Sequence, residues 1–256
     1  MKLKSQIYDQ AKYYEIAFSF VNAEKQGNLF EQFIKKYSKI KVGAVLDLGC
    51  GTALQLREMA KRGYKAIGLD LSSRMLKYLG QEALSEGLEI ETIKANMNNF
   101  KLKQQVDFVY IMMGSIIYAG NNNSFLSHLN SVASSLKSGG LYLIENTPLN
   151  WADPKFLKAQ TWTMRKNGIK IKTTYKLTAK DTYKQIVLQD FILDVDDNGV
   201  KRKYLDHDEL KIFFPEEFKL LIEKNGQFEF IGFFERYSAK KIEGISSENL
   251  VLLRKI

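Results

Sequence analysis

Short apolar runs alternate with amphipathic segments along most of this 256-residue chain. Runs with the length and composition of buried strands lie at residues 44–48, 65–71, 89–94, 106–112 and 141–145. Between them, apolar residues recur at helical spacing, notably after Ser72 and Ser124, which can each serve as an N-cap. Such alternation is typical of parallel strands joined by crossover helices. The pattern therefore predicts an α/β fold.

The segments on either side of this alternating region have other patterns. In residues 1–40, apolar positions from Tyr14 to Val21 and from Phe30 to Tyr37 predict two helices, with Gly27 and Asn28 between them. Farther along, the turn signals at 166–168 and 197–199 predict hairpins in an antiparallel insertion. A helix from Pro215 to about Gly226 and two strands, at 228–234 and 249–253, then follow. We predict an N-terminal helical lid at 1–40, a body formed by 41–150 and 211–256, and an insertion at 151–210 that covers the acceptor site.

Composition narrows the class of protein. The chain has no apolar run long enough to span a bilayer, and its first residues do not resemble a secretory signal, so we expect a cytoplasmic protein without a membrane partner. One cysteine and two histidines give no internal disulfide and no metal-ligand cluster. The net charge is +9, and residues 151–205 hold twelve Lys or Arg against six Asp. This basic segment leaves an anionic partner such as RNA open.

A glycine-rich loop follows the first strand of the alternating region. Residues 45–53 read VLDLGCGTA, which places a tight turn between a strand and a helix, where a ligand can approach bare backbone. Leu54 replaces the third glycine of a dinucleotide loop, and Asp47 would repel a phosphate. An acidic residue here favours a cofactor with an ammonium group, as in S-adenosylmethionine. Asp70, at the end of the second strand, is placed to accept hydrogen bonds from ribose hydroxyls.

At these residues the sequence resembles the class I S-adenosylmethionine-dependent methyltransferase family. The motifs that carry the resemblance are VLDLGCGTA, IGLDLS and SLKSGGLYLIE. The resemblance implies a Rossmann-like, seven-stranded, mostly parallel sheet with helices on both faces. It also implies cofactor contacts at the methionine end from Asp47, Gly49, Gly51 and Thr52, at the ribose from Asp70 and Leu71, at the adenine from Asn96 and Met97, and after the fourth strand from Met113, Gly114 and Ser115, with Cys50 and Met75 as further cofactor-binding candidates. Two departures from the family pattern are Ala53, where the loop usually has a third glycine, and Asn96, where an acidic residue usually binds the adenine amino group.

The absence of two motifs narrows the classes of methyl acceptor that the sequence predicts. The segment after the fourth strand, MMGSIIY, lacks the motif that holds a nucleobase amino group, and Cys50 lies inside the cofactor loop, so it is no pyrimidine nucleophile. The remaining resemblance is to small-molecule methyltransferases of the glycine N-methyltransferase-like and sugar N-methyltransferase-like groups. In those groups an N-terminal tyrosine before an acidic residue folds over the cofactor, and Tyr14 followed by Glu15 matches it.

We therefore expect in-line methyl transfer to a nitrogen or oxygen of a small molecule, with S-adenosylhomocysteine as the product. Alignment of the reactants and exclusion of water supply most of the catalysis, so a dedicated base is optional. Catalytic candidates are Tyr14, His207 and Glu145, the last two as bases, and Trp151, Phe156 and Trp162 are candidates to close the acceptor pocket. Two alternatives stay open, an RNA methyltransferase that uses Lys170, Lys172 and Lys176, and a non-catalytic cofactor-binding module. Either a monomer or a homodimer fits the sequence.

Overall fold

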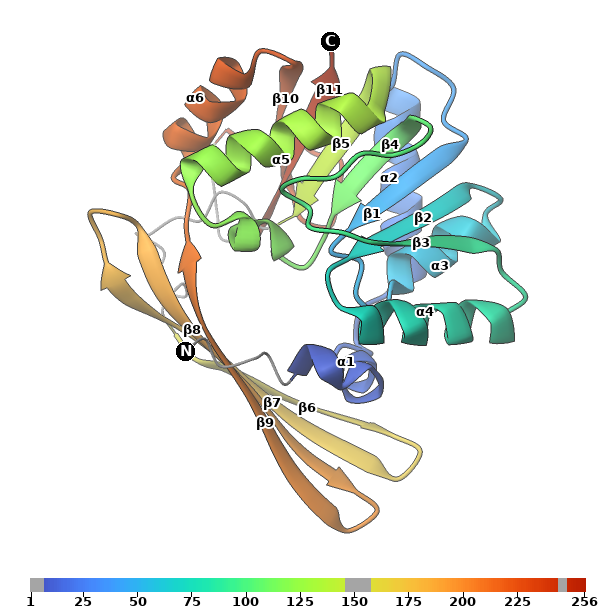
Figure 1. Ribbon diagram of the computed structural model, residues 1–256, viewed down its shortest axis with the longest axis vertical. Coiled ribbons are helices and arrows are strands. Elements are labelled where there is room, and N and C mark those ends of the chain that lie inside the picture. Colours follow the sequence, from blue (N-terminus) through green and yellow to red (C-terminus); the bar gives the residue numbers. More distant parts are fainter. Residues whose placement is uncertain (1–6, 146–157, 244–247) are drawn as a thin grey trace.

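The computed structural model describes residues 7–145, 158–243 and 248–256 and contains two β-sheets with a helical layer on each face of the larger one (Figure 1). The strands of the large sheet are β1 (Ala44–Leu48), β2 (Lys65–Asp70), β3 (Ile90–Lys94), β4 (Val106–Ile111), β5 (Leu136–Glu145), β10 (Phe228–Glu235) and β11 (Asn249–Lys255). The strands of the second sheet are β6 (Gln160–Lys166), β7 (Ile169–Asp181), β8 (Ile186–Asp197) and β9 (Val200–Lys211). The α-helices are α1 (Ala11–Ala17), α2 (Ala23–Tyr37), α3 (Leu54–Lys61), α4 (Ser73–Ser85), α5 (Asn122–Ser135) and α6 (Pro215–Asn225), and two short 3-10 helices are η1 (Ile7–Asp9) and η2 (Ser115–Ala119). None of the helices in these ranges is long and apolar enough to cross a membrane.

The large sheet has the strand order β10-β11-β5-β4-β1-β2-β3 and confirms the predicted seven-stranded Rossmann-like fold. Strand β1 pairs in parallel with β2 and β4, whereas β11 is antiparallel to both of its neighbours. In this register Asp47 of β1 lies beside Gly68 of β2 and Tyr110 of β4. The carboxyl ends of the parallel strands therefore meet along one edge, which is where ligands bind in open α/β sheets.

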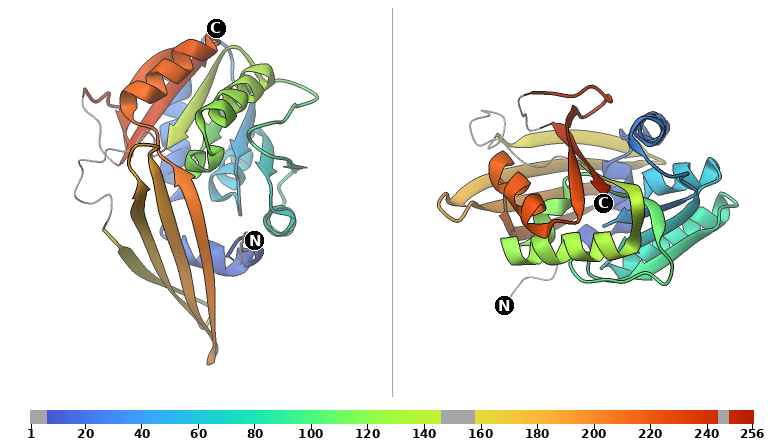
Figure 2. Two further views of the ribbon diagram at one scale, coloured as in Figure 1. Left: turned by 60° about the vertical axis from the view of Figure 1, so that its left-hand side comes forward. Right: turned by 90° about the horizontal axis from the view of Figure 1, so that it is seen from above.

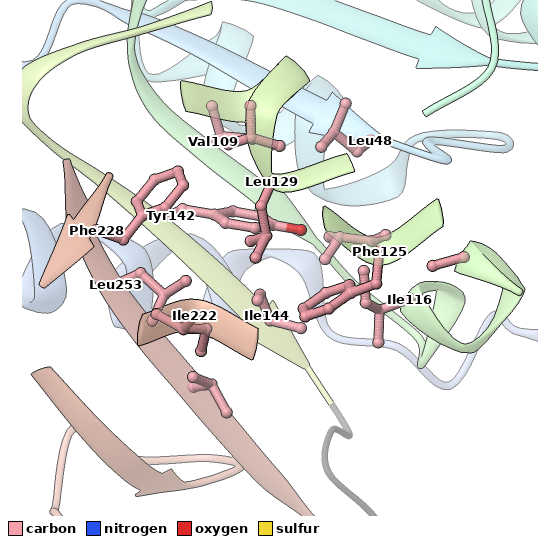
Figure 3. Close-up of a cluster of buried hydrophobic side chains, with 14 of the residues drawn as sticks. Leu48, Val109, Ile116, Phe125, Leu129, Tyr142, Ile144, Ile222, Phe228 and Leu253 are labelled. Atoms are coloured by element: carbon pink, nitrogen blue, oxygen red, sulfur yellow. The ribbon is translucent and has the colours of Figure 1, made fainter. Parts of the chain in front are cut away.

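Each face of the large sheet buries its own apolar core. On one face, Phe125 and Leu129 of α5 pack with Tyr142 and Ile144 of β5, and Ile222 of α6 joins them (Figure 3). On the other face, α2, α3 and α4 contribute buried residues such as Phe30, Leu56 and Leu79. Burial on both faces explains why the strands read as continuous apolar runs in the sequence.

The N-terminal helices differ from the sequence-based prediction. Gly27 and Asn28 lie inside α2, and the break between α1 and α2 comes earlier, at residues 18–22. A Cβ on Gly27 would lie 2.8 Å from Nε of Arg62, so a larger residue there would displace this arginine from its bonds to Glu31 and Glu58. Helix α2 also buries Phe30 and Phe33 against the sheet. We therefore count α2 with the body, and the predicted division into lid, body and insertion stays a prediction.

Helix α1 instead packs against the second sheet, between that sheet and the body (Figures 1 and 2). The inner face of the second sheet presents Ile171, Phe191 and Leu193, and α1 covers them with Ile16 and Ala17. The predicted antiparallel insertion is confirmed, with the order β6-β7-β8-β9. Its twelve- and thirteen-residue strands form a long curved wall below the carboxyl edge of the large sheet (Figure 2).

The helix caps are partly as predicted. The side chain of Ser72 accepts a hydrogen bond from the backbone N–H of Met75, as expected of an N-cap. The prediction for Ser124 is wrong, because the cap of α5 is Asn121, whose Oδ1 accepts from the backbone N–H of Ser124 at 2.9 Å. Both Asn121 and Ser124 are good capping residues, so the sequence alone did not separate them.

His128 of α5 is fully buried between the sheet and the loop after β3. Its Nδ1 lies 2.8 Å from the carbonyl oxygen of Met97 and therefore donates to it, so Nε2 accepts from the hydroxyl of Tyr142 at 2.6 Å. Burial lowers the pKa of His128 to about 4. The folded protein thus holds a neutral imidazole at a pH where an exposed histidine is charged.

We expect this histidine to make the protein less stable in acid. Above about pH 6.5 the imidazole is neutral in both the folded and the unfolded protein. As the pH falls from about 6.5 to about 4, the imidazole of the unfolded chain becomes protonated while that of the folded chain stays neutral. The loss reaches about 3 kcal/mol over that window. Urea unfolding of the wild type and of His128→Gln at several pH values measures it. The stability advantage of the wild type over His128→Gln should shrink as the pH falls, and a constant difference would contradict this account.

Candidate active site

A cavity of about 630 Å³ lies where the carboxyl edge of the large sheet faces the inner side of the second sheet. A smaller cavity of about 40 Å³ adjoins it. Residues that line both cavities are Tyr14, Phe18, Gly49, Met113 and Ser115. The larger space thus has a wall from the body, a wall from the insertion and a cover from α1.

The loop after β1 supplies bare backbone to both cavities. Gly49 and Gly51 have positive φ angles of 62° and 53°, so only glycine fits there without strain. Ala53 also has a positive φ, of 58°, which costs an alanine roughly 1 kcal/mol. A Cβ on Gly51 would lie 3.8 Å from Cε1 of Tyr14, which is an ordinary van der Waals contact. The tyrosine ring therefore lies directly over the glycine loop.

Asp70 ties the glycine loop to the start of α4. Its Oδ2 accepts from the backbone N–H of Gly51 at 2.8 Å, and its Oδ1 accepts from that of Ser72 at 2.7 Å. The carboxylate lines the larger cavity, and burial raises its pKa. Each carboxylate oxygen retains a lone pair for a ligand hydroxyl.

Asp47 is the second acidic residue of the site and is almost fully buried against the smaller cavity. Burial and the nearby charge of Asp70 raise its pKa well above the usual range. Within the described ranges, no lysine or arginine pairs with Asp47 or Asp70. A buried carboxylate, Asp47, and a partly buried one, Asp70, without a lysine or arginine partner make a site suited to a cationic ligand. The ammonium and sulfonium groups of S-adenosylmethionine meet that requirement, and the contact of Asp70 with its ribose hydroxyls stays a prediction.

Tyr14 lies between the acidic end of the cavity and a group of aromatic side chains. Its ring centroid is 4.7 Å from that of Phe18 and 5.8 Å from that of Tyr8. The next residue, Glu15, forms a buried ion pair with Arg57 of α3 at 2.8 Å, which fixes α1 on the body. Burial raises the pKa of Tyr14, so its hydroxyl is a hydrogen-bond donor and not a base at neutral pH.

Glu145 forms a hydrogen bond that holds the loop after β4 in place. Its Oε2 accepts from the backbone N–H of Met113 at 2.6 Å, and its Oε1 accepts from Nε of Arg236 at 2.6 Å. The side chain is 1% exposed and lines neither cavity. The hypothesis that Glu145 acts as a base is therefore not supported, because both oxygens are engaged away from the ligand space. Met113 and Gly114 have positive φ angles, so this support holds an unusual backbone in place.

His207 lies on the wrong side of the second sheet. It pairs in register with Asp190 of β8, and its Nδ1 lies 2.6 Å from Oδ1 of that residue on the outer face. The neighbours that line the cavity, Gln189 and Phe191, point to the opposite face because side chains alternate along a strand. The proposed role of His207 as a base is wrong for this reason.

The predicted cofactor contacts divide into two groups. Those that line a cavity are Asp47, Gly49, Cys50, Gly51, Thr52, Asp70, Met113, Gly114 and Ser115. Those that line neither are Leu71, Met75, Asn96 and Met97. The Oδ1 of Asn96 accepts from the backbone N–H of Asn98 within its own turn, at 2.9 Å. The contacts proposed for the adenine therefore stay predictions.

Several residues of the larger cavity were not found from the sequence. Tyr8, Tyr118 and Gln189 line it, as does Arg236, one residue past the end of β10. Trp162 lines it as predicted, and its Nε1 donates to the carbonyl oxygen of Ala17 at 2.7 Å. Trp151 and Phe156 lie outside the described residues. The missed residues belong to segments that are distant in sequence, and no local motif marks them.

Comparison with known proteins relates the body of this chain to methyltransferases. Residues 45–140 match the family model described as a methyltransferase domain. A putative methyltransferase of Geobacillus sp., GWCH70_2453, is 29% identical over 112 residues, which are 44% of this chain and 45% of that protein. The cypemycin N-terminal methyltransferase of Streptomyces sp. is 25% identical over 103 residues, 40% of this chain and 41% of that protein. The match thus spans less than half of the curated relatives' length.

Solved structures match over nearly the whole chain, at low identity. A crystal structure of an S-adenosylmethionine-dependent methyltransferase from Clostridium acetobutylicum has a TM-score of 0.80 and 17% identity, covering 98% of this chain and 99% of that one. DesVI of Streptomyces venezuelae has a TM-score of 0.80 and 16% identity, covering 99% of this chain and all of that one. These likenesses show that the insertion and the N-terminal helices belong to the same fold as the body. Residues 45–140 thus match a methyltransferase domain, and the fold is that of S-adenosylmethionine-dependent methyltransferases of known structure.

Proposed function

We propose that this protein transfers a methyl group from S-adenosylmethionine to a nitrogen or oxygen of a small-molecule acceptor. The observation that carries the proposal is a pair of carboxylates, the buried Asp47 and the partly buried Asp70, which lie beside a glycine loop and have no cationic partner among the described residues. The cavity that holds this acidic end continues into a larger space lined by aromatic residues. One space thus accommodates a cationic methyl donor and an acceptor side by side.

The residues of the chain have distinct roles in this proposal. Asp47 attracts the ammonium group of the cofactor, Asp70 accepts hydrogen bonds from the ribose, and the Gly49–Gly51 backbone allows close approach. The cofactor, when bound, supplies a methyl group on a sulfonium that leaves without acid catalysis. Tyr14 and Phe18 cover the junction between the two parts of the cavity and exclude water. The remaining contribution is alignment of donor and acceptor.

Nitrogen is the favoured acceptor atom. Among the structures that match this chain over nearly all of its length, KedS8 of a Streptoalloteichus species is named as a sugar N-methyltransferase, and CalS10 of Micromonospora echinaspora as an amino pentose methyltransferase. The O-methyltransferases of ubiquinone biosynthesis match over 23% to 35% of the chain, for example 23% for the protein of Nitrosococcus oceani. The insertion that forms the acceptor wall is thus shared with the proteins named for sugar acceptors.

The outer face of the insertion argues against the alternative of an RNA methyltransferase. The lysines of β7 do lie on the solvent side, as the alternation of the sequence predicted. An acidic row on β8 lies beside them, in the pairs Lys170 with Asp196, Lys172 with Asp194 and Lys176 with Asp190. Phosphates would meet carboxylates as well as lysines on this face. Binding to bulk tRNA should therefore be weak at every salt concentration, whereas tight binding that weakens steeply with salt would favour RNA.

An activity assay tests the proposed function directly. The protein is incubated with methyl-labelled S-adenosylmethionine and a panel of small primary amines and alcohols, and methylated products and S-adenosylhomocysteine are measured. We expect acceptor-dependent formation of both. Cofactor binding without transfer to any acceptor would favour a non-catalytic module. The cytoplasmic location and the choice between monomer and homodimer stay predictions.

A further inference from the structure

A tyrosine and an aspartate are paired in the middle of the large sheet, on the neighbouring strands β4 and β1 (Figure 1). Tyr110 of β4 is in register with Asp47 of β1, so both side chains leave the same face of the sheet. The pair two residues earlier, Phe108 with Val45, is apolar and belongs to the core on that face. The polar pair therefore lies where this core meets the smaller cavity, which Asp47 lines.

The ring of Tyr110 is held firmly by its neighbours. Its side chain is fully buried, and its ring centroid lies 4.7 Å from that of Phe30 in α2 and 5.5 Å from that of Phe108. Within the described ranges its hydroxyl forms no hydrogen bond of normal geometry. Buried polar atoms are nearly always paired, and a buried tyrosine hydroxyl usually has a partner. Packing alone therefore favours phenylalanine at this position.

Tyr142 of β5 shows the ordinary arrangement of a buried tyrosine in this sheet. It is fully buried in the core on the other face, and its hydroxyl donates to Nε2 of His128 at 2.6 Å. It lines neither cavity. The incomplete hydrogen bonding of Tyr110 is thus a feature of the candidate site and not of buried tyrosines in this sheet.

The carboxylate of Asp47 is the acceptor toward which the Tyr110 hydroxyl can donate. Burial and the charge of Asp70 raise the pKa of Asp47, whereas donation from Tyr110 lowers it. Cys50 in the glycine loop and Tyr14 of α1 also interact with Asp47, and burial raises the pKa of both, so they are uncharged at neutral pH. Of these groups, Tyr110 is the one that favours the ionised form of Asp47.

We propose that Tyr110 is a positioning residue, which donates a hydrogen bond to the Asp47 carboxylate and keeps it ionised for the ammonium group of the methyl donor. This inference rests on the proposed function and adds a residue that lines neither cavity. Hydrogen bonds between functional groups are often long or bent before a ligand engages them and shorten in the complex. An unpaired phenol beside an acidic ligand site has this character.

The test measures affinity for S-adenosylhomocysteine, which carries the same ammonium group, by calorimetry from about pH 5.5 to about pH 8.5. Wild type and Tyr110→Phe are compared, because phenylalanine keeps the ring and removes only the hydroxyl. Without its donor, Asp47 should take up a proton about one pH unit higher, the equivalent of one hydrogen bond. The variant should therefore bind about tenfold more weakly at the acid end, and the two affinities should converge at the alkaline end. Titration of the ligand contributes equally to both proteins and cancels in the ratio.

Two further comparisons separate this role from packing. Tyr64 also donates to a carboxylate, that of Glu31 at 3.3 Å, but it lines neither cavity. Tyr64→Phe should therefore bind S-adenosylhomocysteine as the wild type does at every pH. In an Asp47→Asn background, the Tyr110→Phe substitution should add no dependence of affinity on pH, because the group that titrates is absent.

Three results would overturn the inference. They are a ratio of affinities that is constant with pH, a pH-dependent effect of Tyr110→Phe that persists in the Asp47→Asn background, and a Tyr110→Phe protein that does not fold. The last result, seen by thermal unfolding, would assign the hydroxyl to the fold and not to the site. A wild type that does not bind S-adenosylhomocysteine refutes the proposed function itself, so the two failures are distinguished.

Discussion

Replacing Asp47 with asparagine is expected to weaken the binding of S-adenosylmethionine about a hundredfold, because the ammonium of the ligand loses its buried counter-charge. The same substitution should make the ligand-free protein more stable at neutral pH. Burial and the charge of Asp70 raise the pKa of Asp47, so its ionised form is unfavourable in the folded state. The gain should be about 1 to 3 kcal/mol, the usual cost of a buried polar group whose hydrogen bonding is incomplete, because the hydrogen bond from Tyr110 offsets only part of the effect of burial. Calorimetry and thermal unfolding at neutral pH measure the two effects.

The stability difference between Asp47→Asn and the wild type should also depend on pH. Because the pKa of Asp47 is raised in the folded state, its contribution to stability is fully present below about pH 4 and is lost as the pH rises through the raised value. The advantage of Asp47→Asn should therefore grow with pH. Asp194→Asn, the same change on the outer face of the second sheet, is the matched control. Equal cofactor affinity in Asp47→Asn and the wild type would contradict the assignment.

Replacing Glu145 with glutamine is expected to destabilise the fold by about 3 kcal/mol, because the guanidinium of Arg236 would lose its charged partner in a mostly buried site. For a protein of this size that corresponds to a fall in Tm of roughly 6 to 12 °C. The double variant Glu145→Gln and Arg236→Met should recover part of the loss, because it leaves no buried charge unpaired. Thermal unfolding of the three proteins gives the comparison.

The same variant separates support from catalysis. If Glu145 positions the loop of Met113, its loss should lower cofactor affinity and leave the shape of the pH–rate profile unchanged. A base that had been removed would instead change a limb of that profile. An unchanged Tm together with a changed profile would contradict the structural role described above.

The local pattern of the sequence predicted the parts of the fold that depend on local patterns. Apolar runs of strand length located all seven strands of the large sheet, and the asparagine–glycine turns at 167–168 and 198–199 located two of the three hairpins of the insertion. Gly27 misled the prediction, since a glycine inside a helical pattern reads as a break. Its reason is tertiary, the close approach of Arg62, and no local signal contains it.

The candidate site also has a part that local sequence patterns predicted and a part that they did not. Asp47, Gly49, Gly51 and Asp70 lie next to one another because parallel neighbouring strands end at one edge, so a motif and a topology were enough to place them. The acceptor wall depends on how the second sheet lies over that edge. Gln189 meets Tyr118 across 71 positions of sequence, and this contact has no motif.

The misassignments of His207 and Glu145 have related causes. Strand alternation predicts that neighbouring residues face opposite ways, but it does not say which face of β9 lines a cavity. A carboxylate at the end of β5 has the right position for a base, yet its partners Met113 and Arg236 come from two other segments. Residue type and a position at a strand end were insufficient to predict a catalytic role, because the role depends on the residues with which the side chain interacts.

The central claim is that the acidic end of the cavity binds S-adenosylmethionine, and titration calorimetry of the wild type beside Asp70→Ala tests it most directly. The account predicts one cofactor bound per chain, and an affinity lower by about 1 to 3 kcal/mol in the variant, which loses the ribose contacts. Thermal unfolding of both proteins shows whether the variant retains its fold despite the lost hydrogen bonds to Gly51 and Ser72. No binding heat in the wild type, or equal affinity in the folded variant, would contradict the claim.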